Sequence, residues 1–311
     1  MISIHVYDTK YKNLWDNFVH ESKNGTFMIK RDYMDYHSDR FEDFSLLFFE
    51  DDKLIAIMPA SRHGHELRSH GGLTYGGIII DYKMTTSKML EIFSLLKTFM
   101  KDHGFASLLY KCIPRIYHKY FSDEDLYALT KNGAILIRRD VSTAISLNNK
   151  ICFSELRRRG IKKAQKNGLE VQQSFEYSKY VELLSSVLEE HHGVRPVHNA
   201  NELQLLSERF PEEIKLFCAY KKEQLYAGVL IFDTSQCVHA QYIANSNEGR
   251  KLGALDLVID YLINNYSIGK SFFDFGISTE NGGMFLNEGL IHQKEMFGGR
   301  AVVYDFYQWI I

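Results

Sequence analysis

The sequence predicts an α/β fold in which a mixed, largely antiparallel sheet flanked by helices is built twice. The chain has 311 residues, which exceeds the usual size of one hydrophobic core and favours two domains of about 150 residues. The same order of strands and helices can be followed in each half, although the halves share little residue-for-residue identity. The polar stretch Asn148-Asn149-Lys150 separates them. We therefore expect one domain at residues 1–150 and a second at residues 151–311.

The second half shows this order clearly. Short polar turns join three apolar runs in its middle, which predicts antiparallel hairpins. Apolar residues at Leu255, Val258, Ile259 and Leu262 recur at helical spacing. The expected elements are helix 154–168, strand 169–174, helices 178–191 and 202–209, strands 214–220, 225–232 and 238–244, helix 253–266, strand 271–275, a helix containing Lys294, and strand 301–311.

The first half repeats this succession, from a strand through two helical segments to three strands and then alternating helices and strands. A duplicated α/β unit is the simplest explanation of this order. The expected elements are strand 2–7, helices 12–21 and 28–36, strands 44–50, 53–61 and 67–80, helix 85–103, strand 106–112, helix 123–132 and strand 135–147.

Composition limits the possible partners. The 37 basic and 39 acidic side chains give a net charge of −2, so no overall field attracts the chain to DNA or to a membrane, and a polyanion needs a local patch. Cys112, Cys152, Cys218 and Cys237 are widely spaced, which favours reduced thiols over a disulfide framework or a zinc ribbon. The N-terminus lacks a signal-peptide pattern, and no apolar run reaches the roughly 20 residues that span a bilayer. We therefore expect a cytoplasmic protein.

The segment 272–299 has the features of a binding or catalytic site. A short apolar strand leads to Asp274, and a polar, glycine-rich connection separates it from the helix that carries Lys294. This connection is longer than the about 2 to 6 residues usual between a strand and a helix. A carboxylate at the carboxyl end of a strand, with a lysine on the next helix, often forms a ligand crevice. Two alternatives stay open: Asp274 caps the loop through local hydrogen bonds, and Lys294 forms a surface salt bridge with Glu288 or Glu295.

A basic helix follows the join between the halves. Residues 154–168 contain one acidic side chain, Glu155, and Arg158, Lys162 and Lys166 share one face of the helix. A solvated surface is one interpretation. The like charges repel by about a few tenths of a kcal/mol per pair, so we favour an anion site and select Arg158 and Lys162 as substrate contacts. The cations of this helix are Arg157, Arg158, Arg159, Lys162, Lys163 and Lys166.

Five segments together resemble the FemAB-like branch of the GNAT acyltransferase superfamily, and the resemblance covers almost the whole chain. It implies two tandem GNAT domains with the acceptor in a groove on or between them. Family members with known roles attach amino acids from aminoacyl-tRNA to peptidoglycan precursors, and many relatives are known only as N-acetyltransferases. The segments are LWDNFVHESKNGTF at 14–27, LTYGG at 73–77, LRRRGIKKAQKNG at 156–168, DFGISTE at 274–280 and QKEMFGG at 293–299.

The resemblance also indicates where a coenzyme A thioester would bind. Such GNAT enzymes carry Q/R-x-x-G-x-G/A at the start of a helix, where backbone N–H groups hold the pyrophosphate. The matching residues here are 250–255, in which Leu255 replaces the final small residue and weakens the expected binding. The alternative is that Gly253 only starts a helix. Residues 81–88 of the first half lack the pattern, which implies an acceptor-binding or scaffold domain. The candidate contacts to acyl-CoA are Arg250, Gly253, Ala254 and Asn245.

Acyl transfer to an amine needs donors for an oxyanion and an acceptor for the proton that leaves the ammonium. The resemblance assigns the oxyanion donors to the strand at 242–245, with Tyr242 as a catalytic candidate. Lys294 is expected to stabilise negative charge in the transition state or to bind a phosphate or carboxylate of the acceptor. Asp274 is expected to accept a proton or orient the amine. A phenol beside glycines offers both a ring face and a polar tip. The expected acceptor contacts are Tyr75, Gly76, Ser278 and Glu280.

Other chemistries find little support in the sequence. His63, His65 and His70 are close in sequence and His191-His192 end a helix, but no carboxylate or cysteine lies at a ligand spacing, so we expect no metal site. A G-x-S-x-G elbow is also absent, which argues against a triad hydrolase.

The sequence therefore predicts an N-acyltransferase that acts on a primary amine, with a cell-wall or polysaccharide precursor as a candidate acceptor. Acyl-CoA is slightly favoured over aminoacyl-tRNA as the co-substrate, because the net charge is not positive and the basic patch is a single helix. No tightly bound cofactor is expected. The alternative is a catalytically silent double-GNAT module that binds an envelope precursor or a nucleotide-sugar.

Overall fold

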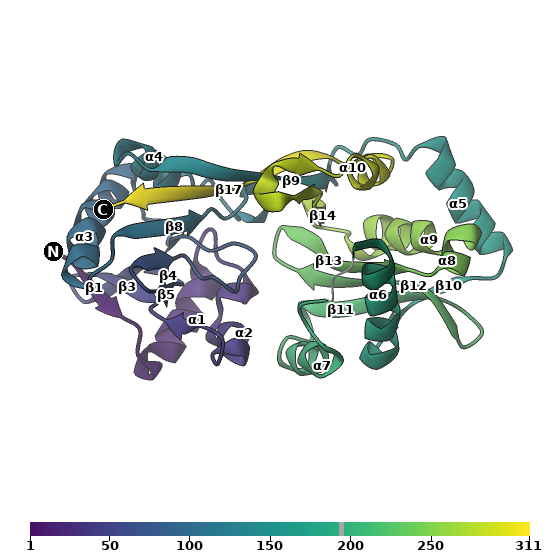
Figure 1. Cartoon of the computed structure of the whole chain (residues 1–311), viewed down its shortest axis with the longest axis horizontal. Coiled ribbons are helices and arrows are strands. Elements are labelled where there is room, and N and C mark those ends of the chain that lie inside the picture. The colour runs from purple at the N-terminus through teal and green to yellow at the C-terminus, as the bar shows by residue number, and fades with distance from the viewer. Residues whose placement is uncertain (193–195) are drawn as a thin grey trace. The chain divides into compact units, whose positions relative to one another are not determined.

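A computed structural model describes residues 1–192 and 196–311 and confirms the α/β fold (Figure 1). The chain divides into two compact units. The first contains residues 1–141, 279–285 and 303–311, and the second contains residues 142–278 and 286–302. Among the described helices, none combines the length and the apolar composition needed to cross a membrane.

The first unit contains two sheets. An antiparallel sheet has the order β1 (Ile2–Val6), β3 (Leu46–Glu50), β4 (Lys53–Met58) and β7 (Ile79–Ile80). In the other sheet, β8 (Ser107–Lys111) lies between β17 (Arg300–Ile310) and β6 (Glu66–Arg68). Beyond β6, this sheet continues through β5 (Ser61–His63) to β2 (Glu42–Asp43). The helices of this unit are α1 (Lys12–Glu21), α2 (Arg31–Met34), α3 (Thr86–Asp102) and α4 (Glu124–Lys131).

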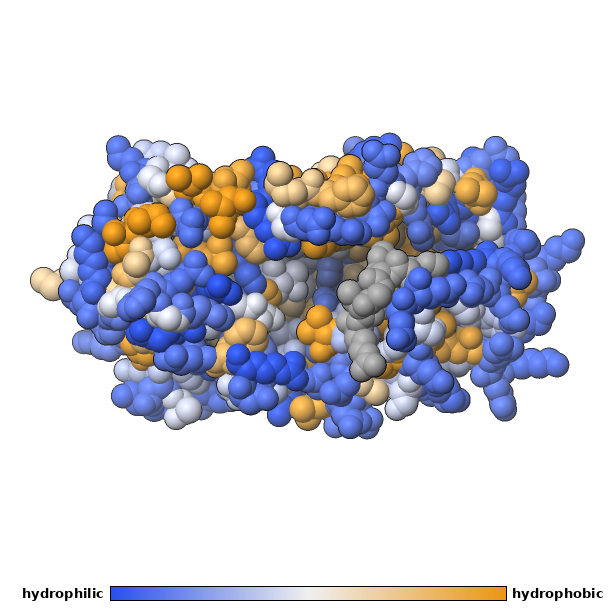
Figure 2. All heavy atoms as spheres, in the orientation of Figure 1, coloured by the Kyte–Doolittle hydropathy of each residue, from blue (hydrophilic) through white to orange (hydrophobic). Residues whose placement is uncertain are grey.

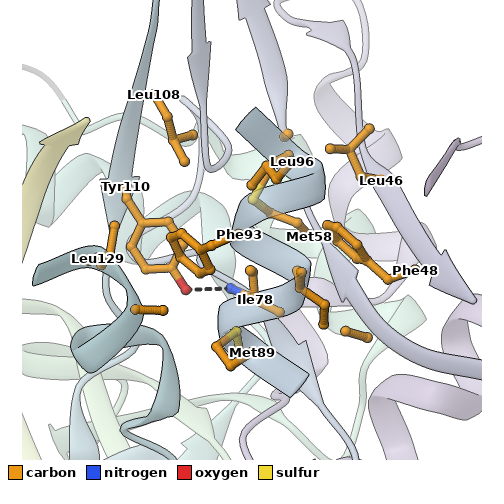
Figure 3. Packing of buried hydrophobic residues seen from close by; sticks show 14 of the residues in the cluster. Leu46, Phe48, Met58, Ile78, Met89, Phe93, Leu96, Leu108, Tyr110 and Leu129 are labelled. Atoms are coloured by element: carbon orange, nitrogen blue, oxygen red, sulfur yellow. Dashed lines mark hydrogen bonds between the residues drawn. The ribbon is translucent and has the colours of Figure 1, made fainter. Parts of the chain in front are cut away.

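Helix α3 forms the centre of the first unit's core (Figure 3). Its buried face places Met89, Phe93 and Leu96 against side chains of the sheets, and these three residues are fully buried. Tyr110 of β8 is also fully buried and receives a hydrogen bond at its hydroxyl from the Ile78 backbone N–H at 2.7 Å. The Tyr110 hydroxyl donates to Asp125 Oδ2 at 2.6 Å, so its hydrogen-bonding capacity as donor and as acceptor is used inside the core.

One predicted strand of the first half is wrong. Residues 67–80 form β6, a ten-residue connection and β7 instead of one strand. Gly77 has a φ of 87°, which side chains rarely adopt, and a Cβ atom there would lie 2.8 Å from the Tyr110 hydroxyl. A Cβ atom on Gly76 would lie 2.1 Å from the Ser69 carbonyl oxygen. The glycines therefore allow a tightly packed loop where apolar composition alone indicated a strand.

The second unit has one sheet in the order β10 (Glu170–Ser174), β11 (Ile214–Lys221), β12 (Gln224–Asp233), β13 (Cys237–Asn245), β14 (Phe272–Ile277) and the last part of β9 (Ile135–Ser146). The predicted hairpins are confirmed, because β11, β12 and β13 pair antiparallel in succession. The helices are α5 (Glu155–Lys166), α6 (Tyr177–His192), α7 (Ala200–Arg209), α8 (Asn247–Leu252), α9 (Ala254–Tyr261) and α10 (Glu288–Glu295), and a π-helical turn, Leu262–Tyr266, follows α9.

Helices α6 and α9 cover opposite faces of this sheet (Figure 1). A Cβ atom on Gly228 of β12 would lie 2.8 Å from the Tyr180 ring of α6. Its neighbours Ala227 and Val229 belong to the apolar cluster that contains α9. Successive side chains of a strand point to opposite faces, so β12 separates the two helices.

The division into units differs from the predicted boundary at residue 150. Strand β9 contributes residues up to Val141 to the first unit and residues from Ser142 to the second. Residues 303–311, predicted as the last strand of the second domain, belong to the first unit, where Phe306 to Ile310 pair with β8. A small hairpin, β15 (Thr279–Glu280) and β16 (Phe285–Leu286), occupies the connection before α10 and was not predicted.

Candidate active site in the second unit

Two parallel strands of the second unit separate after a short stretch of pairing. Strands β13 and β14 pair from Cys237↔Phe272 to His239↔Asp274, and no further pair joins them in the described part of the chain. Strand β13 continues to Asn245 and carries a bulge at Gln241, because Ile231 pairs with Ala240 and Leu230 pairs with Tyr242. The backbone of β13 beyond His239 is therefore available to donate hydrogen bonds on the side that β14 leaves.

Two side chains of this part of β13 carry unsatisfied oxygen atoms. Gln241 Oε1 and Asn245 Oδ1 are buried and lack a hydrogen-bond partner among the described residues. A buried acceptor without a donor costs about 1–3 kcal/mol. An ammonium or amide group bound here would satisfy them.

Asp274 is the centre of a buried hydrogen-bond network. Its side chain is fully buried, and Oδ1 accepts from Ser142 Oγ at 2.6 Å and from the Gly276 backbone N–H at 3.1 Å. Oδ2 lies 2.9 Å from His239 Nδ1. The predicted local capping role is present in the bond to Gly276, but the residue also joins β9, β13 and β14. Ser142 and His239 were missed in the sequence.

His239 is held in one tautomer by this carboxylate. An ionised carboxylate only accepts hydrogen bonds, so Nδ1 of His239 is the donor to Asp274. Nε2 is the ring nitrogen that does not contact this carboxylate. His239 is 6% exposed, which places a potential general base at the point where β13 and β14 separate.

Lys294 binds the polar segment after β14. Its Nζ donates to the carbonyl oxygens of Gly276 and Ile277, each at 2.8 Å, and to Ser278 Oγ at 2.9 Å. Burial lowers the pKa of Lys294 to about 8, and the Asp274 charge opposes this effect. The alternative of a surface salt bridge is wrong, because the side chain is 5% exposed. All three ammonium protons hold residues 276–278, so Lys294 is a positioning residue in this geometry.

Tyr242 forms a second polar pair on β13. Its hydroxyl lies 2.7 Å from His198 Nδ1, and its carbonyl oxygen accepts a hydrogen bond from the Tyr180 hydroxyl at 2.9 Å. Burial raises the pKa of Tyr242, so the phenol remains protonated near neutral pH. His198 was also missed in the sequence; the pair can exchange a proton along its hydrogen bond.

The segment predicted to bind pyrophosphate has a different structure. The Arg250 N–H donates to the Ser246 carbonyl oxygen within α8, and the Gly253 N–H donates to that of Gly249. These two N–H groups are therefore unavailable to a phosphate. Gly253 adopts a φ of 78° between α8 and α9, and Ala254 is fully buried.

Helix α5 covers the beginning of α9. A Cβ atom on Gly253 would lie 2.3 Å from the Gly160 carbonyl oxygen of α5. Asp256 in the first turn of α9 is bonded to Arg157 at 2.8 Å and brings a carboxylate to the helix N-terminus. Both features oppose diphosphate binding at this place, because α5 occupies the space and the Asp256 carboxylate already lies at the helix N-terminus.

The other cations of α5 face solvent. Arg158, Lys162, Lys163 and Lys166 are exposed and form no ion pair within the described residues. The surface over α5 is predominantly hydrophilic in Figure 2. Arg157 differs from them, because it lies over the Phe297 ring at 4.8 Å and is bound to Asp256. Arg157 therefore has a structural role, whereas the exposed cations of α5 are available to bind an anion.

Solved structures with the same architecture cover nearly the whole chain. FemX matches with a TM-score of 0.70 and 12% identity, over 99% of this chain and 97% of that chain. L-PGS from Bacillus licheniformis matches with a TM-score of 0.62 and 13% identity, over 97% and 92%. The chain has a FemAB-like GNAT fold. A tandem GNAT protein from the clavulanic acid biosynthesis pathway has a TM-score of 0.53 and 9% identity, over 99% and 98%. No family model and no curated protein matches the sequence.

In this GNAT fold, the remaining predicted contacts lie in different units. Tyr75 is 2% exposed, donates to Thr26 Oγ1 at 3.2 Å and packs on the Tyr117 ring within the first unit. Gly76 is buried beside it, and the exposed Glu280 of β15 belongs to the same unit. Asn245 and Ser278, in contrast, lie in the second unit with Asp274.

The described histidines hold no metal cluster. Among the side chains that the structure describes, no three His, Cys, Asp or Glu gather in a geometry suited to an ion. The His191 and His192 side chains lie outside the described residues.

Proposed function

We propose that the chain is an acyltransferase that moves an aminoacyl group to a primary amine, with its chemistry at the separation of β13 and β14. The single observation that carries the proposal is the buried His239–Asp274 pair at the last paired position of these strands. A carboxylate that orients a neutral imidazole is a common way to prepare a general base. The base would accept the proton that the attacking amine loses.

Other groups at this place fit the remaining demands of the reaction. The β13 backbone beyond His239 supplies N–H donors for the oxyanion. The protonated Tyr242 phenol, bonded to His198, is suited to return a proton to the leaving oxygen. The buried oxygens of Gln241 and Asn245 offer acceptors to an amino group. Lys294 keeps residues 276–278 in position after β14.

The geometry favours aminoacyl-tRNA over acyl-CoA as the donor, which reverses the preference from the sequence. The expected pyrophosphate segment is covered by α5 and is followed directly by Asp256. The exposed cations of α5 suit a nucleic-acid backbone, whose binding is mainly electrostatic. The fold supports a transferase of this kind, and an amine on a cell-wall or polysaccharide precursor is the acceptor class that we propose.

A transfer assay tests the proposal. The protein is incubated with tRNA carrying a radiolabelled amino acid, or with labelled acetyl-CoA, and with amine acceptors that include amino sugars and lysine-containing peptides. We expect label transfer from the tRNA, and a loss of about 10²–10⁴-fold in rate for His239→Gln. His292→Gln on the exposed surface of α10 is the matched control. Transfer from acetyl-CoA alone would contradict the donor assignment, and full activity of His239→Gln would contradict the base.

The role of α5 has a separate test. Arg158→Glu with Lys162→Glu should weaken tRNA binding and reduce its dependence on salt. Lys101→Glu with Lys131→Glu changes the net charge equally at two exposed positions of the first unit and should have little effect. Equal weakening by both pairs would indicate only a general charge effect.

A catalytically silent binding module is the second candidate, because Lys294 directs all its donors to its own chain. It predicts that tRNA or precursor binding persists while no acceptor receives label. A labelled product that requires His239 excludes it.

A further inference from the structure

The first unit contains two adjoining cavities that the proposed transfer chemistry does not use. The larger has a volume of about 550 Å³ and is lined by Arg115 and residues 118–123, in the connection from β8 to α4. The smaller, of about 390 Å³, shares residues 121–123 and is also lined by Thr86 and Tyr127. Their size suits a small molecule.

Ser122 lines both cavities and carries a buried, unsatisfied hydroxyl. Ser122 is 3% exposed, and its Oγ has no hydrogen-bond partner within the described residues. Glu124, which lines the smaller cavity, has the same property at Oε2, although its Oε1 accepts from Lys23. Native proteins rarely leave buried polar atoms without partners. A ligand that forms a hydrogen bond with Ser122 would satisfy its hydroxyl after a rotation of the side chain.

The larger cavity also carries an uncompensated positive charge. Arg115 is neutralised by Asp123, with Nη2 and Nε at 2.8 and 3.0 Å from the carboxylate oxygens. Lys119 has no acidic partner in the described part of the chain, and its Nζ donates to the His20 carbonyl oxygen at 2.7 Å. Burial, and then the charge of Lys30, lower the pKa of Lys119. A negative group in the cavity would stabilise its ammonium form.

Two exposed aromatic rings complete the larger cavity. Phe121 is 84% exposed and Tyr120 is 59% exposed. Their ring centroids are 5.4 Å apart with an interplanar angle of 64°, so the two faces form a corner. Such faces pack against the C–H surface of a sugar ring, while hydroxyl groups of the sugar donate and accept hydrogen bonds at the edges. We propose that these cavities bind an anionic saccharide, either a sugar phosphate or a uronic acid.

Calorimetric titration of the full chain tests this site without any transfer reaction. The probes are glucose 6-phosphate, glucuronate, glucose, inorganic phosphate and UMP. We expect one of the two charged sugars to bind about tenfold or more tightly than glucose and phosphate, and the better of the two identifies the acid group. Phosphate binding as tight as that of glucose 6-phosphate, or tighter binding of UMP, would overturn the saccharide assignment.

Three variants locate the binding. Phe121→Ala and Lys119→Gln should each weaken binding of the charged sugar about tenfold. The first variant loses the ring contact and the second loses the ion pair. Phe175→Ala removes a similarly exposed phenylalanine of the second unit, 75% exposed, and should leave the affinity unchanged. Because Phe121 is exposed, its removal tests the site without disturbing the core. Unchanged binding by Phe121→Ala would refute the location.

Discussion

Replacing Lys294 with methionine should change how stability depends on pH. The pKa of the buried ammonium is lowered from its ordinary 10.5 to about 8 by burial. The unfolded chain therefore binds one more proton than the folded chain between these values, and stability rises with pH there. Each pKa unit corresponds to about 1.4 kcal/mol, so protonated Lys294 costs the folded state about 3 kcal/mol below pH 8. The wild type should gain this amount over Lys294→Met as the pH rises to 10.5.

Urea unfolding of both proteins at pH 7.5, 8.5, 9.5 and 10.5 measures this difference in stability. These pH values cover the range between the pKa of Lys294 in the folded chain and its ordinary value. Both tryptophans, Trp15 and Trp309, belong to the first unit, so circular dichroism is a better signal than fluorescence. Lys111, whose pKa burial also lowers to about 8, is present in both proteins and cancels in the difference. Lys101→Met, at an exposed position, is the control. A difference between wild type and Lys294→Met that stays flat or falls with pH would refute the reasoning.

Three further changes test the packing of the second unit, each by the free energy of unfolding. Gly253→Ala should lower the free energy of unfolding by about 2–4 kcal/mol, because Gly253 has a positive φ and contacts α5. Gly269→Ala, at a position with a φ of 86° and open space around it, should lower it by only about 1 kcal/mol. Equal losses would mean that the contact with α5 does not restrict Gly253. Asp274→Ala should lower the free energy of unfolding by about 3–5 kcal/mol, because buried donors lose a charged acceptor. The isosteric Asp274→Asn should lower it clearly less. The opposite order would contradict the hydrogen-bond network around Asp274. Asn199→Ala removes the capping box of α7 and should cost about 1 kcal/mol, and no change would show that the cap is dispensable.

Local patterns were sufficient to predict most elements. The helix expected at 12–21 matches α1, and the strands expected around 214–244 form the hairpins of the second unit. Periodicity and turns act within a few residues, so a single sequence contains them. The connection at residues 69–78 was missed because its packing depends on Tyr110, which lies more than thirty residues away in the sequence.

The candidate site was only partly visible for the same reason. Asp274 stands out in the sequence because a polar loop follows it. Ser142 and His239 become its partners only when β9 and β13 pair on either side of β14. The coverage of Gly253 by α5 likewise depends on tertiary packing. Pairings between distant segments decide the chemistry here, and one sequence does not reveal them.

The place of β17 has a consequence for the order in which the protein can assemble. Residues 303–311 supply a strand beside β8 and the fully buried Trp309, whose ring lies 5.4 Å from that of Phe93. The first 141 residues leave the ribosome long before this strand is made. Until it arrives, β8 exposes an unpaired edge and the core lacks one of its largest side chains, a condition that invites association with other chains. The first unit is thus the first to be synthesised, but it can complete its fold only after residues 303–311 have been made.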